Sequence, residues 1–446
     1  MAGSAASAPG GAAGDTDARI QIRSHAGVYA ARVASSAAGT DSPAKLRGAM
    51  VDHWRTYWRA FAAPVESAMR TVPRHLFLPG VSVDEAYAED VVVTHRDAEG
   101  AVISSASMPS IVAEMLEQLD VRAGHRVLEI GAGTGYNAAL LAHLAGPAGA
   151  VTTVDIEPGV AEGARQNLAV AGYKTVRVVC GDGEHGNSAD APYDRVIVTA
   201  GAWDLPPAWR EQLAPGGRIV VPLRIRGLTR SVALERDGRC WRSVSCEPSG
   251  FIPLRGTGHY PERDIALDTD GKAVLRVDGA LPADPNALRQ AAGNPPARSW
   301  TGVTVTGRGL GDLDYWLAAL DGLGRLITRF PGHGLVSPAF QGGSMAVVDQ
   351  ETFAYLMLRP ADGTNGQAES ELGICAYGPA GEWLASRVAD RIRVWAAESR
   401  SLITPWIEVY PVGTPAPPSG NLLVADKRHV RLIVRAANLA NETDES

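Results

Sequence analysis

Three glycines at alternate positions follow a short apolar run and precede a helical pattern. Gly131, Gly133 and Gly135 come directly after Arg126–Ile130, a run that suits a buried strand. Glycine lets the backbone turn sharply and approach a ligand where any Cβ would collide. A strand, a glycine turn and a helix in this order predict a site for a nucleotide-containing cofactor.

The spacing of these glycines distinguishes between cofactors. A dinucleotide fingerprint has glycines at its first, third and sixth positions, whereas the sixth position here is Tyr136. Gly-x-Gly-x-Gly after a strand that carries an acidic residue, here Glu129, is typical of methyltransferases that use S-adenosylmethionine. The alternative is a glycine-rich turn in an unrelated α/β protein.

Acidic residues also follow the next two predicted strands. Asp155 lies in the strand 151–156, where its carboxylate can accept hydrogen bonds from both hydroxyls of a ribose or cap the helix that begins near Pro158. Asp182 follows the third strand and can accept a hydrogen bond from an adenine amino group or form part of an ordinary turn. Because the carboxyl ends of parallel strands meet at one edge of a sheet, both carboxylates are expected beside the glycines.

The elements that would hold these residues alternate between strand and helix. Helical patterns at 44–61, 65–71 and 108–119 precede the glycine loop. The alternation predicts strands at 126–130, 151–156, 176–181, 193–199 and 218–223, with helices at 137–144, 159–171 and 206–213. A hairpin with Asp237-Gly238 at its turn follows. The predicted fold class is α/β, a Rossmann-like doubly wound sheet with helices before it and a smaller α+β domain after it.

The composition changes along the chain predict four segments. We expect a low-complexity tail at 1–43, a methyltransferase domain at 44–260, a linker at 261–299 and a C-terminal α+β domain at 300–440. The last of these contains a long helical pattern at 380–399 and strand patterns at 406–410 and 431–435.

Bulk properties exclude several classes of protein. The net charge of −7 provides no electrostatic footprint for nucleic acid, and no apolar run is long enough to span a bilayer. Four scattered cysteines and a start without a signal-peptide pattern favour a cytoplasmic protein. The histidines are scattered without metal-ligand spacing, so no metal is expected, and a monomer is favoured.

Seven segments, taken together, resemble the protein-L-isoaspartate O-methyltransferase family over about residues 45–260. They are Met69-x-x-Val72-Pro73-Arg74-His75-x-Phe77, Ala86-Tyr87, Ile103-Ser104, Val127–Tyr136, Gly181-Asp182-Gly183, Pro192-Tyr193-Asp194 and Phe251-Ile252-Pro253-Leu254.

The resemblance implies transfer of a methyl group from S-adenosylmethionine to a carboxylate in a peptide, with S-adenosylhomocysteine as product. It implies that Ser104 orients the accepting carboxylate; the alternative is a helix cap, for which Ser107 is better placed. The implied cofactor-binding residues are Ile103, Glu129, Gly131, Ala132, Gly133, Gly135, Tyr136, Asn137, Asp155, Ile156, Asp182, Gly183 and Thr199. The implied substrate-binding residues are Ser105, Ser107, Ala200 and Arg255.

The chain departs from the family pattern just before Ser104. The family usually has Gly-x-Gly-Gln-Thr-Ile-Ser-x-Pro there, whereas this chain reads Ala98-Glu99-Gly100-Ala101-Val102-Ile103-Ser104-Ser105-Ala106-Ser107. This departure and the C-terminal domain resemble a subgroup that methylates an aspartate of ribosomally made, cyclised peptides, with lanthipeptides favoured over graspetides and lasso peptides. The ester would then give a succinimide or isoaspartate, and residues 300–440 would recognise the peptide.

Two alternatives stay open. One is general repair of isoaspartyl residues, which keeps the chemistry and changes its purpose. The other is a degenerate methyltransferase fold that serves only as a binding protein, against which the retained Glu129, Asp155, Asp182 and Ser104 argue.

Overall fold

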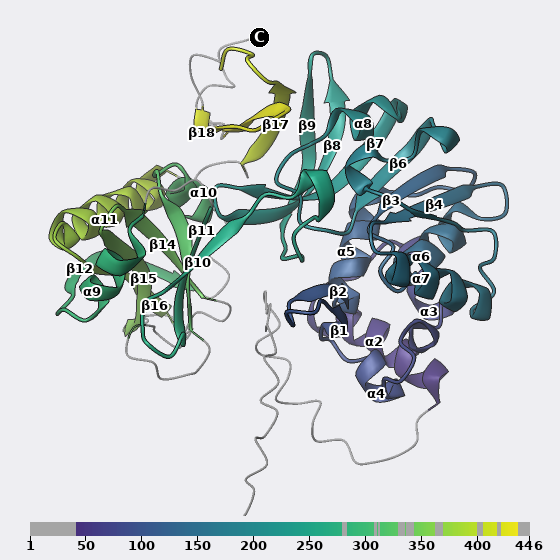
Figure 1. The fold of residues 1–446 in the computed structure, drawn as a ribbon, viewed down its shortest axis with the longest axis horizontal. Helices are drawn as coiled ribbons and strands as arrows, with labels where there is room; N and C mark the ends of the chain where they lie inside the picture. Colours follow the sequence, from purple (N-terminus) through teal and green to yellow (C-terminus); the bar gives the residue numbers. More distant parts are fainter. Residues whose placement is uncertain are drawn as a thin grey trace, which may run out of the picture.

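The computed structural model describes residues 42–278, 283–306, 310, 313–328, 335, 343–361, 369–398, 405–416 and 421–435. The predicted tail lies outside the described residues except for its last two positions. The described residues form a ten-stranded sheet, a seven-stranded sheet and a short hairpin (Figure 1). No helix in these ranges is both long enough and apolar enough to cross a membrane.

The ten-stranded sheet has a parallel part and an antiparallel part. Its strand order is β18-β19-β17-β9-β8-β7-β6-β3-β4-β5, and the strands from β7 to β5 are parallel. The parallel strands are β3 (Arg126–Ile130), β4 (Ala150–Asp155), β5 (Arg177–Cys180), β6 (Tyr193–Val198) and β7 (Leu213–Ile225). The antiparallel strands are β8 (Leu228–Asp237), β9 (Cys240–Pro248), β17 (Trp406–Pro411), β18 (Asn421–Asp426) and β19 (Val430–Arg435).

Helices from the N-terminal part cover one face of this sheet. Val127, Ile197 and Val220 point into a core that these helices share, since successive strand residues alternate between the two faces. The helices of this part of the chain are α2 (Pro43–Tyr57), α3 (Ala63–Thr71), α4 (Val83–Ala86), α5 (Pro109–Leu119), α6 (Tyr136–Ala145), α7 (Pro158–Val170) and α8 (Pro207–Glu211). A two-stranded hairpin of β1 (Val92–Arg96) and β2 (Val102–Ala106) precedes α5.

The seven-stranded sheet forms a second lobe beside the first (Figure 1). Its strand order is β10-β11-β13-β14-β15-β16-β12, all antiparallel. The strands are β10 (Glu262–Ala266), β11 (Ala273–Asp278), β12 (Ala297–Thr306), β13 (Leu323–Thr328), β14 (Ser344–Asp349), β15 (Thr352–Ala361) and β16 (Glu369–Tyr377). Its helices are α9 (Pro285–Ala292), α10 (Leu313–Ala318) and α11 (Gly381–Glu398).

The structure differs from the expected division of the chain at two places. The segment 261–299, expected to be a linker, contains β10, β11, α9 and the start of β12. The strands β17–β19, expected in the second domain, extend the first sheet by pairing Val409 with Trp241 and Glu408 with Arg242 of β9. Strand patterns are local, whereas the choice of a partner strand depends on contacts distant in sequence.

The two lobes also share one hydrophobic core. The face of the ten-stranded sheet opposite the N-terminal helices carries Val196 and Val221, which belong to the same buried cluster as Leu317 of α10, Leu384 of α11 and Ile374 of β16. α10 contacts β8 and β18 of the ten-stranded sheet and also α11, which packs on β12, β15 and β16 of the other sheet. The two lobes are therefore joined by direct packing through α10.

Candidate cofactor and substrate pocket

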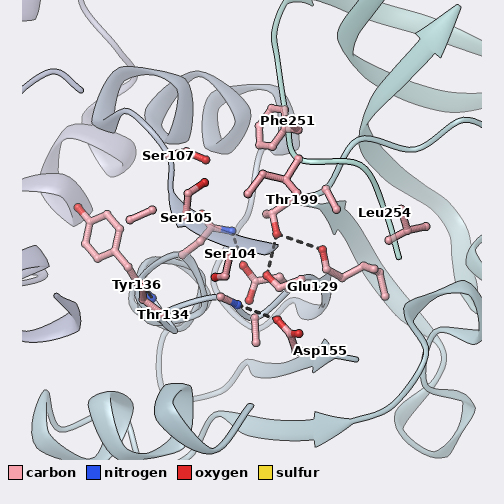
Figure 2. A pocket seen from close by; sticks show the side chains of 18 of the residues that line it. Ser104, Ser105, Ser107, Glu129, Thr134, Tyr136, Asp155, Thr199, Phe251 and Leu254 are labelled. Carbon is pink, nitrogen blue, oxygen red and sulfur yellow. Dashed lines mark hydrogen bonds between the residues drawn. The ribbon is translucent and has the colours of Figure 1, made fainter. Parts of the chain in front are cut away.

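A pocket opens at the carboxyl ends of β3, β4 and β6 (Figure 2). Its other walls come from the β1–β2 hairpin, the first turns of α5 and the segment 250–255. β3 lies between β4 and β6, so the pocket sits where the strand order of the parallel sheet reverses. Ligands bind at such switch points in open α/β sheets, as the sequence predicts.

The glycines of the loop after β3 occupy positions that a side chain would disturb. Gly131 has φ +101°, and a Cβ on it would lie 2.6 Å from Thr199 Oγ1. Gly135 has φ +85°, and its Cβ would lie 3.1 Å from the carbonyl oxygen of Ala164 in α7. Gly131 keeps the loop close to β6, and Gly135 lets α6 pack against α7.

Asp155 holds the glycine loop from the end of β4. Its Oδ2 accepts a hydrogen bond from the backbone N–H of Gly133 at 3.0 Å, and its Oδ1 accepts one from the N–H of Glu157 at 3.1 Å. Burial raises the pKa of Asp155 above its usual range. A carboxylate has about four acceptor positions, so both oxygens keep capacity for a ligand hydroxyl. The predicted alternative of a helix cap is wrong for Asp155, because the N-cap of α7 is Glu157 and the bond to its N–H lies before the helix. The ribose role stays a prediction.

Glu129 lies beneath the loop and is fully buried. Its Oε1 accepts a hydrogen bond from Asn137 Nδ2 at 2.8 Å, and its Oε2 accepts one from Thr153 Oγ1 at 2.6 Å. Desolvation raises the pKa of Glu129 to about 7, against the effect of these two donors. The carboxyl group therefore orients Asn137 and faces the pocket with a protonation state that changes near neutrality.

We expect the titration of Glu129 to affect stability. A carboxyl group whose pKa rises on folding from 4.5 to about 7 stabilises the folded protein while protonated, so its contribution falls between those values and levels off above pH 7. The unfolding free energy of Glu129→Gln relative to the original protein should rise by up to about 3 kcal/mol from about pH 5 to about pH 8. Urea unfolding of the cofactor-free proteins at several pH values measures this.

A substitution at a second buried carboxyl group, Glu114, tests whether the change in unfolding free energy with pH belongs to Glu129. Burial also raises the pKa of Glu114 to about 7, and Arg59 Nη1 lies 3.4 Å from its Oε1. Glu114→Gln leaves Glu129 intact, so combining the two substitutions should give additive slopes. A Glu129→Gln difference that stays flat across this range would contradict the assignment.

Ser104, Ser105 and Ser107 lie on one side of the pocket, across from Leu254 (Figure 2). Ser104 is 7% exposed, and its Oγ accepts a hydrogen bond from Thr94 Oγ1 at 3.0 Å. The predicted alternative of a cap is wrong for both Ser104 and Ser107, because the N-cap of α5 is Met108 and the N–H of Ser110 in the first turn donates to Glu89 Oε1 at 3.0 Å. Ser104 is on β2 instead, with its hydroxyl available to the pocket.

Three predicted residues have partners that the sequence did not indicate. Asp182 accepts hydrogen bonds from the N–H and the hydroxyl of Thr257, both at 2.8 Å, and lies outside the pocket lining. Arg255 lines the pocket rim and forms an ion pair with Glu157. The hydroxyl of Tyr136 contacts Met69 Sδ at 3.8 Å and its ring packs against Phe77, although the residue is part of the pocket lining. For Asp182, the adenine role stays a prediction that would require Thr257 to share the carboxylate.

The other predicted residues meet at the pocket. They are Ile103, Ala132, Gly133, Asn137, Ile156, Gly183, Thr199 and Ala200. These side chains and glycines, with the acceptors on Asp155 and Glu129, can hold an adenosyl group and a cationic centre.

Several lining residues were not predicted as site residues. The segment that contains Phe251 and Leu254 reaches the pocket because it pairs with Gly201, which donates to the carbonyl of Ile252 and accepts from the N–H of Leu254, both at 2.8 Å. Arg74 is 1% exposed and donates to the backbone carbonyl of Ser107 at 2.8 Å. Both segments are among the seven that resemble the family, so the resemblance could have identified them as part of the site. Four apolar residues of α5 and its N-cap complete the wall, namely Met108, Ile111, Val112 and Met115.

The C-terminal strands reach the loops behind the pocket. In the turn between β18 and β19, Arg428 Nη1 donates to the carbonyl of Thr257 at 3.0 Å. The N–H of His429 donates to Asp204 Oδ2 at 2.8 Å. The loop whose Thr257 donates to Asp182 is therefore held by the turn between β18 and β19.

Comparison with known proteins agrees with this geometry. The sequence model of the family described as protein-L-isoaspartate(D-aspartate) O-methyltransferase matches residues 47–258. A protein-L-isoaspartate O-methyltransferase of Methanopyrus kandleri is 44% identical over 203 residues, which are 44% of this chain and 86% of the relative. Protein-L-isoaspartate O-methyltransferase 2 of Archaeoglobus fulgidus is 40% identical over 210 residues, 46% of this chain and 90% of the relative.

Solved structures that are similar to this chain include two that are named for protein-L-isoaspartate O-methyltransferase. A protein-L-isoaspartate O-methyltransferase structure covers 82% of this chain and 96% of its own length, with 20% identity and a TM-score of 0.45. A putative protein-L-isoaspartate O-methyltransferase of Plasmodium falciparum, in complex with S-adenosyl-L-homocysteine, covers 47% of this chain with 15% identity and a TM-score of 0.41. The sequence relatives align over nearly their whole length, and the chain therefore belongs to the protein-L-isoaspartate O-methyltransferase family.

Proposed function

We propose that this chain uses S-adenosylmethionine to methylate an aspartate side-chain carboxylate of a ribosomally synthesised, cyclised peptide. Lanthipeptides are the favoured class, followed by graspetides and lasso peptides. The ester is then attacked by the following backbone nitrogen, which releases methanol and forms a succinimide that persists or hydrolyses to isoaspartate.

The pocket fits this cofactor in shape and in charge. Gly131 lets the loop lie directly against Thr199 at the end of β6, and Ile156 and Gly183 line the pocket where a base can lie. Asp155 has acceptor positions for ribose hydroxyls, and Glu129 provides an acidic group for a cation. When bound, S-adenosylmethionine supplies a methyl group whose bond to sulfur breaks as a carboxylate oxygen bonds to its carbon, and the electron pair stays on sulfur.

The residues around the pocket have a modest chemical task. A carboxylate is already ionised at neutral pH, so no side chain has to act as a general base. Ser104 can donate a hydrogen bond that orients the carboxylate beside the glycine loop, since a Cβ on Gly133 would lie only 3.9 Å from Ser104 Oγ. Apolar residues such as Met108 and Phe251 exclude water, so placement supplies most of the acceleration.

The β1–β2 hairpin is the observation that carries the finer part of the proposal. It stands where the family usually has a glycine-rich loop before its serine, and Ile103, Ser104 and Ser105 of β2 line the pocket. A hydrogen-bonded hairpin is a stiffer wall than a glycine loop, so it suits a substrate whose own conformation is constrained. The shared core with the second lobe supports a fixed peptide-binding surface on residues 300–440.

Mass spectrometry with matched peptides tests the proposal. The enzyme and S-adenosylmethionine are incubated with linear and cyclised forms of candidate precursors and with short isoaspartyl peptides. We expect the cyclised form to gain one methyl group and then lose methanol, and Ser104→Ala to slow the gain by about 20-fold, as for loss of one oriented hydrogen bond to a charged group. Ready methylation of linear isoaspartyl peptides, with no reaction of any cyclised aspartyl peptide, would contradict it.

Repair of isoaspartyl residues is the second candidate. It is favoured by the names of relatives that are 40% to 44% identical over nearly their full length. The same assay decides between the two, because a repair enzyme acts on isoaspartate in unrelated linear peptides and leaves ordinary aspartate unchanged.

A further inference from the structure

The β1–β2 hairpin is irregular at the point where it reaches the pocket. The residue pairs across it are Val93 with Ser105, His95 with Ser104 and Arg96 with Val102. Thr94 is therefore an extra residue in β1, and Ile103 is an extra residue in β2. Bulges of this kind change the direction of side chains and are frequent beside active sites.

The bulge brings the hydroxyl of Thr94 to that of Ser104. Thr94 Oγ1 donates to Ser104 Oγ at 3.0 Å. The lining residues of the pocket include Ser104 and leave out Thr94. An influence of Thr94 on a ligand in the pocket therefore passes through Ser104.

The direction of this hydrogen bond decides what Ser104 can do. A serine hydroxyl has one hydrogen to donate, and its oxygen can accept from others. Since Ser104 Oγ accepts from Thr94, its own hydrogen is free to point into the pocket. Hydroxyl groups in series polarise one another, which strengthens the last donor. An ionised carboxylate only accepts hydrogen bonds, so it is the matching partner for this donor.

We propose that Thr94 is a positioning residue that holds Ser104 as a hydrogen-bond donor toward the carboxylate of the substrate. The proposal rests on the proposed function, in which Ser104 contacts that carboxylate. One carboxylate oxygen is then held by Ser104, and the other stays free to accept the methyl group.

A set of four variants tests this role. Thr94→Val removes the hydroxyl with little change in shape, Thr94→Ser keeps it, and Ser104→Ala is made alone and together with Thr94→Val. The readouts are kcat and KM for a peptide that the original enzyme methylates, and the affinity for that peptide in the presence of S-adenosylhomocysteine, measured by calorimetry. The affinity for S-adenosylhomocysteine itself and the thermal unfolding temperature serve as controls.

Thr94→Val should lower kcat about tenfold and weaken peptide binding severalfold, while affinity for S-adenosylhomocysteine changes by less than about twofold. Thr94→Ser should keep at least about half of the activity, and Thr94→Val should have almost no further effect when Ser104 is already alanine.

Three results would overturn the proposal. Original activity and peptide affinity in Thr94→Val would remove the role of Thr94, even if Ser104→Ala is impaired and the proposed function stands. Equal effects of Thr94→Val with and without Ser104 would show that it does not act through the serine. Full activity of Ser104→Ala, or no methylation of any peptide, would remove the role of Ser104 in the proposed function and that of Thr94 with it.

Discussion

Gly131→Ala should weaken binding of S-adenosylhomocysteine by on the order of 100-fold, through strain and loop displacement. The residue has φ +101°, and the new Cβ would lie 2.6 Å from Thr199 Oγ1. That hydroxyl donates to the carbonyl of Gly131 at 2.7 Å, so the clash falls on an interaction that holds the loop to the end of β6. The loop has to move at the place where the cofactor approaches it. Calorimetric titration with S-adenosylhomocysteine measures the loss.

Gly163→Ala is the matched control for this substitution. Gly163 lies within α7, and a Cβ there would meet nothing within 4 Å. Alanine is favoured over glycine inside a helix by about 1 kcal/mol, so this variant should bind as the original protein does and unfold at a slightly higher temperature. Unchanged affinity in Gly131→Ala would show that the glycine loop does not contact the cofactor.

A chain that ends at residue 404 should fail to fold cooperatively. It lacks β17–β19, whose Ile407, Val409, Leu432 and Val434 are almost completely buried in the core that joins the sheets. Leu432→Ala in the full chain should lower the unfolding free energy by about 2–5 kcal/mol, since it removes buried methyl groups and leaves a cavity. Circular dichroism during heating measures cooperativity and stability in both variants, and binding of S-adenosylhomocysteine shows whether the pocket still forms.

A change in the same segment but outside the core provides the comparison. Val412 follows β17 and is 55% exposed, so Val412→Ala should change the unfolding free energy by less than about 0.5 kcal/mol. A shortened chain that unfolds at the original temperature and binds the cofactor product would show instead that the first domain does not depend on β17–β19, as the sequence led us to expect.

The features that the sequence predicted well are local ones. Gly131 and Gly133 could be placed at the pocket because a glycine loop, the strand before it and the helix after it are consecutive in the chain, whereas Gly135 lies against α7 and outside the pocket lining. The parallel strands followed from apolar runs separated by helices of adequate length, and the strand predicted over 151–156 differs from β4 by one residue at each end.

The features that were missed depend on contacts between distant segments. The contact of Thr257 with Asp182 was missed because nothing near Asp182 in sequence shows that Thr257 donates to its Oδ2. The pairing of β17 with β9 could not be predicted, since several strands present the same apolar alternation. The β1–β2 hairpin was missed because its exposed polar residues resemble a loop, whereas its buried ends, Val92 and Ala106, pack against Leu78 and Ala86 from an earlier part of the chain.

In the sequence, the strands of the second lobe lie between β9 and β17, which are neighbours in the first sheet. This order has a consequence for synthesis of the protein. β9 ends at Pro248, but β17, its neighbour on the side away from β8, begins only at Trp406, after every strand of the other sheet has been made. The ribosome therefore releases the glycine loop and its pocket long before it releases the strands that cover β9 and tie down Thr257. Loop closure over such a distance is slow, and an uncovered strand edge is open to aggregation in the meantime. Active enzyme should appear only after β17–β19 have left the ribosome, which makes these three strands a checkpoint on its maturation.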